Sequence, residues 1–218
     1  MRNILNKNII FPKKKFVILQ VNLLPELRNL DNFIKEIMQF INKYEKNYTF
    51  LIPTFTKRFF FKTGKSDFFH KKQKCTNGYF GNYIINSKKG FRSNHATHSY
   101  YLIGKDALKL YRNSQFNDGP FEILNKIGIS NISFININFK PIHSFHLAEN
   151  KLGLSKNVLS NFLGSYYKSK NRILWNKMKY LNGCDKKYDK LFDKYLKRKI
   201  IFSIKLKRSK IYFGKLIN

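Results

Sequence analysis

Acidic residues and cysteine are scarce in this sequence of 218 residues. Only 12 Asp and Glu residues stand against 43 Lys and Arg residues, which leaves a net charge of +31. The 2 cysteines exclude the disulfide-dense frameworks of small secreted domains. No apolar run approaches the roughly 18 residues that suggest a membrane-spanning helix. Repulsion among so many positive charges destabilises a compact isolated chain, so the composition predicts a polyanionic partner and argues against a freely diffusing metabolic enzyme.

Alanine is also rare, and it occurs only at Ala96, Ala107 and Ala148. Lys, Asn, Ile, Phe and Tyr are abundant instead, and all of them have A/T-rich codons. This bias predicts an A/T-rich genome such as that of an organelle. Mutation pressure enriches Lys and Asn, but it does not account for the shortage of acids, so the charge excess keeps its functional meaning.

Six segments carry a regular apolar pattern, in the order strand, helix, strand, strand, helix, strand: 16–22, 30–44, 48–52, 96–103, 121–127 and 131–140. The clearest is the amphipathic helix over 30–44, with apolar residues at helical spacing. Gly128 follows the second helix at a position that suits its C-terminal cap. A further short helix is predicted at 105–111. The order predicts an α+β fold, a ferredoxin-like βαββαβ plait with four antiparallel strands backed by two helices.

Two regions fall outside this pattern. Residues 63–95 show no sustained period, and an irregular stretch of that length inside a compact domain indicates a functional loop. After Pro141 we expect a mainly helical basic C-terminal extension, with an extended arm at its end; its helices are predicted at 152–163, 171–181 and 186–199, and the arm at 200–213. The predicted domains are an N-terminal arm at 1–14, a ferredoxin-like domain at 15–140 with insertions near 76–94 and 105–117, and the extension at 141–218.

Basic and aromatic residues alternate through 57–92, and residues 186–215 hold twelve Lys and Arg residues against two acids. Lysine neutralises phosphates, while exposed aromatic rings stack on unpaired bases. The pattern therefore favours contact with RNA, although a flexible Lys-rich loop and an extension that is basic only for solubility remain alternatives.

Motifs for catalysis or metal binding are weak. His95 and His98 are three residues apart, a spacing that in a strand puts them on opposite faces, so no shared metal is expected. His143 and His146 repeat the spacing. Gly64-Lys65-Ser66 matches the end of a phosphate-binding loop, but Phe59 stands where that loop needs its first glycine. The acids are too few for paired-carboxylate chemistry, so we predict no metal, no cofactor and no enzymatic activity.

The order of several short motifs resembles the small-subunit ribosomal protein S-ten family over residues 15–140. The matching segments are Ile52-Pro53-Thr54, Lys57-Arg58-Phe59, Ser66-Asp67, His70-Lys71-Lys72, and Thr97-His98 followed by Tyr101-Leu102-Ile103. A weaker resemblance, through Gly90-Phe91-Arg92, is to ribosomal protein S-eleven. The S-ten resemblance implies a ferredoxin-like domain in the head of the small ribosomal subunit. It also implies a long basic hairpin loop, beginning at Lys57-Arg58-Phe59, that enters ribosomal RNA and contacts neighbouring head proteins.

We therefore expect a structural constituent of the mitochondrial small ribosomal subunit, located in the matrix and bound to ribosomal RNA and neighbouring ribosomal proteins. A gene carried by the organelle genome fits the composition. No membrane span and no small-molecule substrate are expected. The alternatives are an organellar nucleic-acid enzyme of maturase or endonuclease type and a basic accessory subunit of a membrane respiratory assembly. The expected RNA-contacting residues are Lys57, Arg58, Lys62, Lys65, His70, Lys71, Lys72, Lys74, Arg92, His98, Lys197, Arg198, Lys199, Lys205, Lys207, Arg208 and Lys210.

Overall fold

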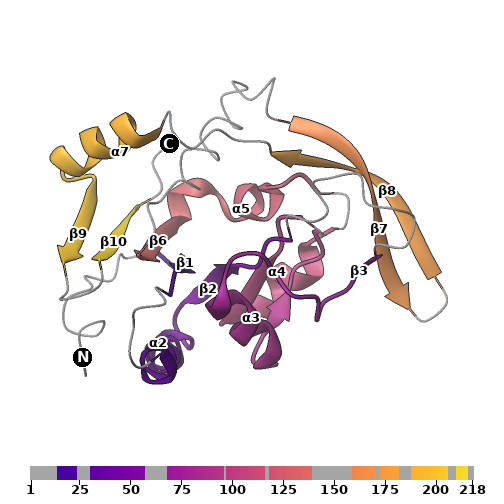
Figure 1. Ribbon diagram of the computed structural model, residues 1–218, viewed down its shortest axis with the longest axis horizontal. Coiled ribbons are helices and arrows are strands. Elements are labelled where there is room, and N and C mark those ends of the chain that lie inside the picture. Colours follow the sequence, from indigo (N-terminus) through magenta and orange to yellow (C-terminus); the bar gives the residue numbers. More distant parts are fainter. Residues whose placement is uncertain are drawn as a thin grey trace.

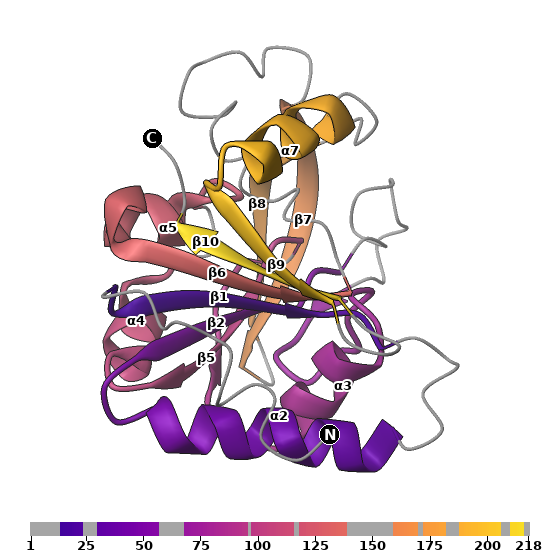
Figure 2. The same cartoon turned by 90° about the vertical axis from the view of Figure 1, so that its left-hand side faces the viewer.

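A mixed seven-stranded sheet forms the centre of the molecule, with helices on both of its faces (Figures 1 and 2). The computed structural model describes residues 14–23, 30–56, 68–95, 97–115, 118–138, 159–169, 172–181, 188–205 and 210–215. The strand order across the sheet is β4-β5-β2-β1-β6-β10-β9. Within the described residues, no helix is long and apolar enough to cross a membrane.

The strands run in both directions, and the parallel ones lie at the middle of the sheet. Their bounds are β1 (Phe16–Val21), β2 (Thr49–Pro53), β4 (Phe91–Arg92), β5 (Tyr100–Gly104), β6 (Ile132–Ile137), β9 (Ile201–Lys205) and β10 (Lys210–Lys215). Strand β1 pairs in parallel with β2 on one side and with β6 on the other. The pairs β2–β5, β4–β5, β6–β10 and β9–β10 are antiparallel.

The first face of the sheet is covered by α2 (Leu30–Tyr44) and α3 (Tyr79–Asn86). Helix α2 buries Phe33, Ile37 and Ile41 against alternate strand residues such as Val17 and Leu19. Two parallel strands need a crossover connection, and α2 supplies it between β1 and β2. The amphipathic pattern over 30–44 is thus confirmed, because an apolar stripe at helical spacing packs one side of a helix on a sheet.

The opposite face is covered by α4 (Ala107–Asn113), α5 (Glu122–Ile127) and α7 (Tyr188–Lys197), which share a second core cluster with the strands. A short 3-10 turn, η2 (Ile129–Asn131), leads from α5 into β6. Gly128 ends α5 with φ of 82°, a conformation that favours glycine, so its predicted capping role is confirmed.

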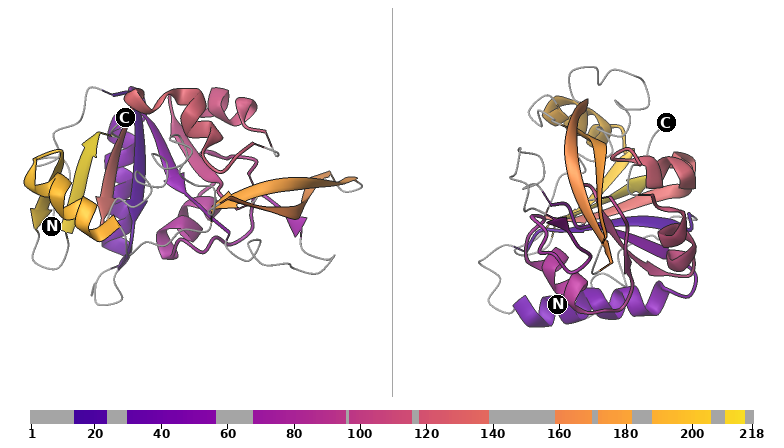
Figure 3. Two further views of the ribbon diagram at one scale, coloured as in Figure 1. Left: turned by 90° about the horizontal axis from the view of Figure 1, so that it is seen from above. Right: turned by 90° about the vertical axis from the view of Figure 1, so that its right-hand side faces the viewer.

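A second sheet consists of β3 (Phe68–Phe69), β7 (Leu159–Ser169) and β8 (Arg172–Leu181). Its long β7–β8 hairpin projects away from the main sheet (Figure 3). The helices predicted at 152–163 and 171–181 are therefore wrong wherever the structure describes these residues. Their backbone hydrogen bonds come from pairing with a distant segment, which a local helical pattern does not reveal.

The ferredoxin-like plait is also wrong. Strand β1 has parallel partners on both sides, whereas the expected plait was an antiparallel sheet with helices on one face. The arm predicted at 200–213 instead supplies β9 and β10, and β10 pairs with β6, so the same sheet extends beyond residue 140. The loop predicted at 63–95 contains α3 and β4, which are too short to give a sustained period.

Strand β10 should support the stability of the whole domain. Ile211, 1% exposed, packs in the same core cluster as α2 and β1. We expect Ile211→Ala to lower the free energy of unfolding by about 3 kcal/mol, because it leaves a cavity in the core. Urea denaturation followed by circular dichroism measures this change. Leu108→Ala, at a 41% exposed position on α4, is the control and should cost less than about 1 kcal/mol. Equal small effects would mean that β10 is not part of the core.

Candidate functional site

The carboxyl ends of the three parallel strands β1, β2 and β6 meet at one edge of the sheet, which we call the carboxyl edge. Ligands of open α/β sheets bind outside this edge. The chain beyond β2 pairs there with the segment that precedes β5: Thr54 N donates to Ser99 O at 2.9 Å, and Thr56 N donates to Thr97 O at 3.0 Å. Half of the buried polar side chains of the described structure belong to these two segments.

Arg92 links the segments at this edge by hydrogen bonds. All five N–H groups of its guanidinium donate hydrogen bonds: Nε to Ser99 Oγ (2.9 Å), Nη1 to Lys71 O (3.3 Å) and Gln73 O (2.5 Å), and Nη2 to Thr54 O (2.6 Å) and Thr56 Oγ1 (2.9 Å). These acceptors come from three separate segments of the chain. Only a planar fork of donors satisfies such a set, so Arg92 fixes the relative positions of the three segments.

The charge of Arg92 is stabilised by neutral oxygens, because none of these five acceptors is a carboxylate. Its side chain is 3% exposed, and its guanidinium lies over the Phe69 ring at 4.9 Å. Burial lowers the pKa of Arg92 to about 10, so the group still carries its charge at neutral pH. Arg92 was expected to contact RNA, but its side chain is buried and its donors bind oxygens of the protein itself.

Two imidazoles lie next to Arg92, with ring centroids 5.6 Å apart. His95 Nδ1 accepts from the backbone N–H groups of Thr97 (3.2 Å) and His98 (3.0 Å). Thr97 Oγ1 lies 2.9 Å from His98 Nδ1 and 3.2 Å from His95 Nδ1. The two rings were expected on opposite faces of a strand. The described part of 93–99 instead precedes β5 and bends, which brings the rings together.

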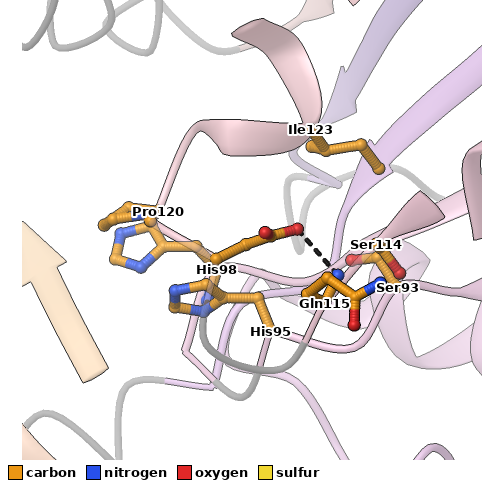
Figure 4. Close-up of a pocket in the computed structure, with 9 residues that line it drawn as sticks. Ser93, His95, His98, Ser114, Gln115, Pro120 and Ile123 are labelled. Carbon is orange, nitrogen blue, oxygen red and sulfur yellow. Dashed lines mark hydrogen bonds between the residues drawn. The ribbon is translucent and has the colours of Figure 1, made fainter. Parts of the chain in front are cut away.

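These histidines line a small polar pocket with Ser93, Ser114, Gln115, Asp118, Gly119, Pro120 and Ile123 (Figure 4). Asp118 accepts from the Gln115 backbone N–H at 2.7 Å and forms an ion pair with Lys126 at 2.8 Å. The pocket offers about 10 Å³ to the centres of water-sized molecules, room for about one water. It can therefore present polar groups to a ligand, but it is too small to enclose one.

Lys71 belongs to the loop beside this pocket. Its Nζ donates to Arg92 O at 2.7 Å and to the side chain of Asn94, and it lies 4.8 Å from the centroid of the Tyr111 ring. Burial, followed by the nearby charge of Arg92, lowers the pKa of Lys71 to about 7. A lysine that is held inward and is partly neutral at pH 7 is a poor phosphate ligand, unlike its exposed neighbours Lys72 and Lys74.

A pair of buried amides marks the junction between β1 and β6. Gln20 and Asn136 are direct register partners and are 5% and 2% exposed. Within the described structure, Gln20 Oε1 and Asn136 Oδ1 have no hydrogen-bond donor. Both residues are next to last in their strands. Gln20 lies on the same face of the sheet as Ile18. Ile18 belongs to a core cluster in which Phe55 and Phe121 contact the His98 ring. This edge therefore has spare acceptors for a donor ligand.

The structure disperses the residues predicted to bind RNA. Arg92 and His98 are buried at the carboxyl edge, and Lys71 is half-buried there, while His70, Lys72 and Lys74 are exposed on the same loop. Near the C-terminus, Lys197 ends α7, Lys205 ends β9 and Lys210 begins β10, while Arg198 and Lys199 lie in the turn between α7 and β9. Lys57, Arg58, Lys62, Lys65, Lys207 and Arg208 lie outside the described residues.

Sequence reasoning missed the amides Gln20 and Asn136, Thr97 and the residues around Asp118. The available signal was the density of small polar residues in 93–99 directly before a strand, because such residues at a strand end commonly line ligand sites.

Comparison with known proteins identifies a different family from the one expected. A sequence profile described as aminoglycoside 3-N-acetyltransferase matches residues 42–216. No curated protein sequence matches the chain. Similar solved structures include the YokD protein from Bacillus subtilis, with a TM-score of 0.73 and 15% identity over 93% of this chain and 83% of that one.

Two other similar structures are complexes with a ligand. AAC-VIa bound to sisomicin has a TM-score of 0.71 and 13% identity, over 93% of this chain and 87% of that one. AAC-IIIb in a binary complex with CoASH has a TM-score of 0.70 and 9% identity, over 93% and 85%.

These findings overturn the ribosomal interpretation. The S-ten resemblance and the structural role in the small-subunit head are wrong, because the profile covers most of the chain and the fold matches acetyltransferases. The prediction that the chain is not an enzyme falls with them, as does the expectation of ribosomal RNA and ribosomal proteins as partners. The mitochondrial location expected with the ribosomal role is also wrong, because the matching profile describes aminoglycoside 3-N-acetyltransferases and a similar structure comes from Bacillus subtilis. The maturase and respiratory-subunit alternatives find no support.

The Arg92 network should not tolerate lysine. We expect Arg92→Lys to lower the free energy of unfolding by about 3 kcal/mol, because a single ammonium leaves several buried oxygens without donors. Chemical denaturation at pH 7 measures the difference. Arg112→Lys, at an exposed position on α4, is the matched control and should change stability by less than about 0.5 kcal/mol. If both variants were equally stable, Arg92 would not hold the carboxyl edge.

Proposed function

Because this chain belongs to the aminoglycoside 3-N-acetyltransferase family, we propose that it transfers the acetyl group of acetyl-CoA to an amine. In this reaction the amine nitrogen attacks the thioester carbonyl carbon and a C–N bond forms. The C–S bond then breaks, the amine loses one proton, and the CoA sulfur leaves as the thiolate or takes up a proton. An enzyme assists by accepting the amine proton and by stabilising the negative charge on the carbonyl oxygen.

The observation that carries the proposal is the hydrogen-bonded chain His98–Thr97–His95 at the pocket. Thr97 Oγ1 lies 2.9 Å from His98 Nδ1. In the tautomer in which Nδ1–H donates to this hydroxyl, the lone pair of His98 is on Nε2. We assign this nitrogen as the base that accepts the amine proton. Thr97 acts as a positioning residue, because its hydroxyl holds the imidazole in the tautomer that a base requires.

His95 supports the opposite role. Two backbone N–H groups point at its Nδ1, so that nitrogen carries the lone pair and the proton resides on Nε2. A neutral imidazole in this tautomer is a hydrogen-bond donor toward the pocket. It is suited to stabilise the carbonyl oxygen as it gains charge, and it needs no reorganisation during the reaction.

The described residues also fit acetyl-CoA as the donor substrate. The pantetheine arm of CoA contains peptide-like amides, whose N–H groups match the spare oxygens of Gln20 and Asn136 at the same edge. The phosphates of CoA match the net charge of +31. Among the similar structures, AAC-IIIb is described with CoASH and AAC-VIa with sisomicin.

We expect His98→Gln to lower kcat about 100-fold or more, since a general base contributes on that order, while the affinity for acetyl-CoA stays unchanged. Release of the CoA thiol in the presence of an amino sugar measures kcat, and calorimetric titration measures the affinity. Gln39→Ala, at an exposed position on α2 and outside the pocket, is the control and should keep full activity.

The same experiment includes His146→Gln, because this histidine lies outside the described residues and offers another imidazole. If His146→Gln abolishes turnover while His98→Gln does not, the assignment of His98 as the base is wrong. If the wild-type chain neither binds acetyl-CoA nor releases its thiol, the proposed function itself is wrong.

A further inference from the structure

An aminoglycoside is a poor electrostatic match for this chain. Such a substrate carries several ammonium groups at neutral pH, and a site that binds it needs carboxylates to compensate them. This chain has a net charge of +31 and only 12 acids in its whole length. Like charges brought together at a binding site discriminate against a ligand, so the overall charge opposes a polycationic acceptor.

The charges near the pocket also oppose a polycationic acceptor. Asp118 is the one acid among the described residues that line the pocket, and its two oxygens already accept from Lys126 at 2.9 and 2.8 Å. Glu122 stands beside the pocket on the first turn of α5 but does not line it. Asp31 and Asp193 are exposed, Glu36 is half-buried on α2, Asp106 precedes α4, and Glu45 forms an ion pair with Lys89 at 3.0 Å; none of these five acids lines the pocket.

The loop beside the pocket is basic and firmly attached. Residues 70–76 hold Lys71, Lys72 and Lys74 and no acid. Arg92 donates to the carbonyls of Lys71 and Gln73, and Lys71 reaches Asn94, whose Nδ2 donates to Ser114 O in the pocket wall at 2.6 Å. The exposed ammonium groups of Lys72 and Lys74 are therefore carried on a loop that is hydrogen-bonded to the pocket residues.

We propose that the acceptor of this enzyme is an amine on a molecule with net negative charge, in the class of phosphorylated amino sugars, and that the loop 70–76 selects it. The inference rests on the proposed acetyl transfer and specifies its substrate class. The phosphate pairs with Lys72 and Lys74, while the amine, uncharged when it reacts, approaches His98. The reaction is the one given above, with the acetyl group moving from the CoA sulfur to the amine nitrogen.

The test compares three acceptors with the full chain and acetyl-CoA: glucosamine 6-phosphate, glucosamine and sisomicin. The first two present the same amine with and without a phosphate, and the third is a polycation. We expect kcat/KM for glucosamine 6-phosphate to be at least about tenfold higher than for the other two at low salt. Added NaCl should reduce this advantage, because screening weakens surface charge interactions.

A double variant, Lys72→Glu with Lys74→Glu, should lower kcat/KM for glucosamine 6-phosphate about fivefold or more without lowering that for glucosamine. Lys35→Glu with Lys46→Glu, at exposed positions on α2 and just after its end, makes the same charge change away from the loop and should have little effect. If the two double variants behave alike, the loop does not select the acceptor and the inference is wrong.

Sisomicin as the best acceptor, or equal rates for all three, would overturn the inference and leave the proposed acetyl transfer intact. Binding of acetyl-CoA without acetylation of any of the three amines would also overturn it. Failure to bind acetyl-CoA would instead contradict the proposed function, so the two failures are distinguishable by calorimetry.

Discussion

The buried guanidinium of Arg92 is the interaction on which the candidate site depends. It satisfies five oxygens that belong to the end of β2, to the loop 70–76 and to the segment before β5. With these three pieces fixed, Thr97 meets the backbone of Thr56, and the two imidazoles face the same pocket. The dipoles of neutral oxygens replace the water that a buried charge loses, which makes the network costly to disturb.

The net charge led to the wrong kind of protein, because the polyanion that it predicted was taken to be ribosomal RNA. An excess of 31 positive charges does favour a polyanion, and CoA carries several phosphates. The error was to exclude an enzyme on the same ground, because net charge bears on ligands and solubility and does not specify a fold. Strong charge at the loop 70–76 is compatible with the proposed catalysis, because the proposed catalytic groups are the buried imidazoles of His95 and His98.

Elements whose conformation depends on neighbouring residues in the sequence were predictable, and elements that depend on pairing with a distant segment were not. Helix α2 was predictable because its apolar stripe spans 15 residues, and the end of α5 because Gly128 adopts a conformation that glycine favours. The β7–β8 hairpin was not, since its hydrogen bonds join residues such as Leu159 and Leu181 across the chain. The sequence of β10 predicts a basic arm, because its strand conformation depends on pairing with the distant strand β6. The histidine pair required a turn at 93–99 that alternation alone does not reveal.

The most direct test of the central claim is amide hydrogen exchange of the full chain with and without saturating acetyl-CoA. If the carboxyl edge is the substrate site, the ligand should slow exchange in the segments that form it, around 92–100, 114–123 and 132–138, and leave the middle of α2 unchanged. Protection confined to α7 and β9, or no change at any segment, would contradict the assignment of this edge as an acetyl-transfer site.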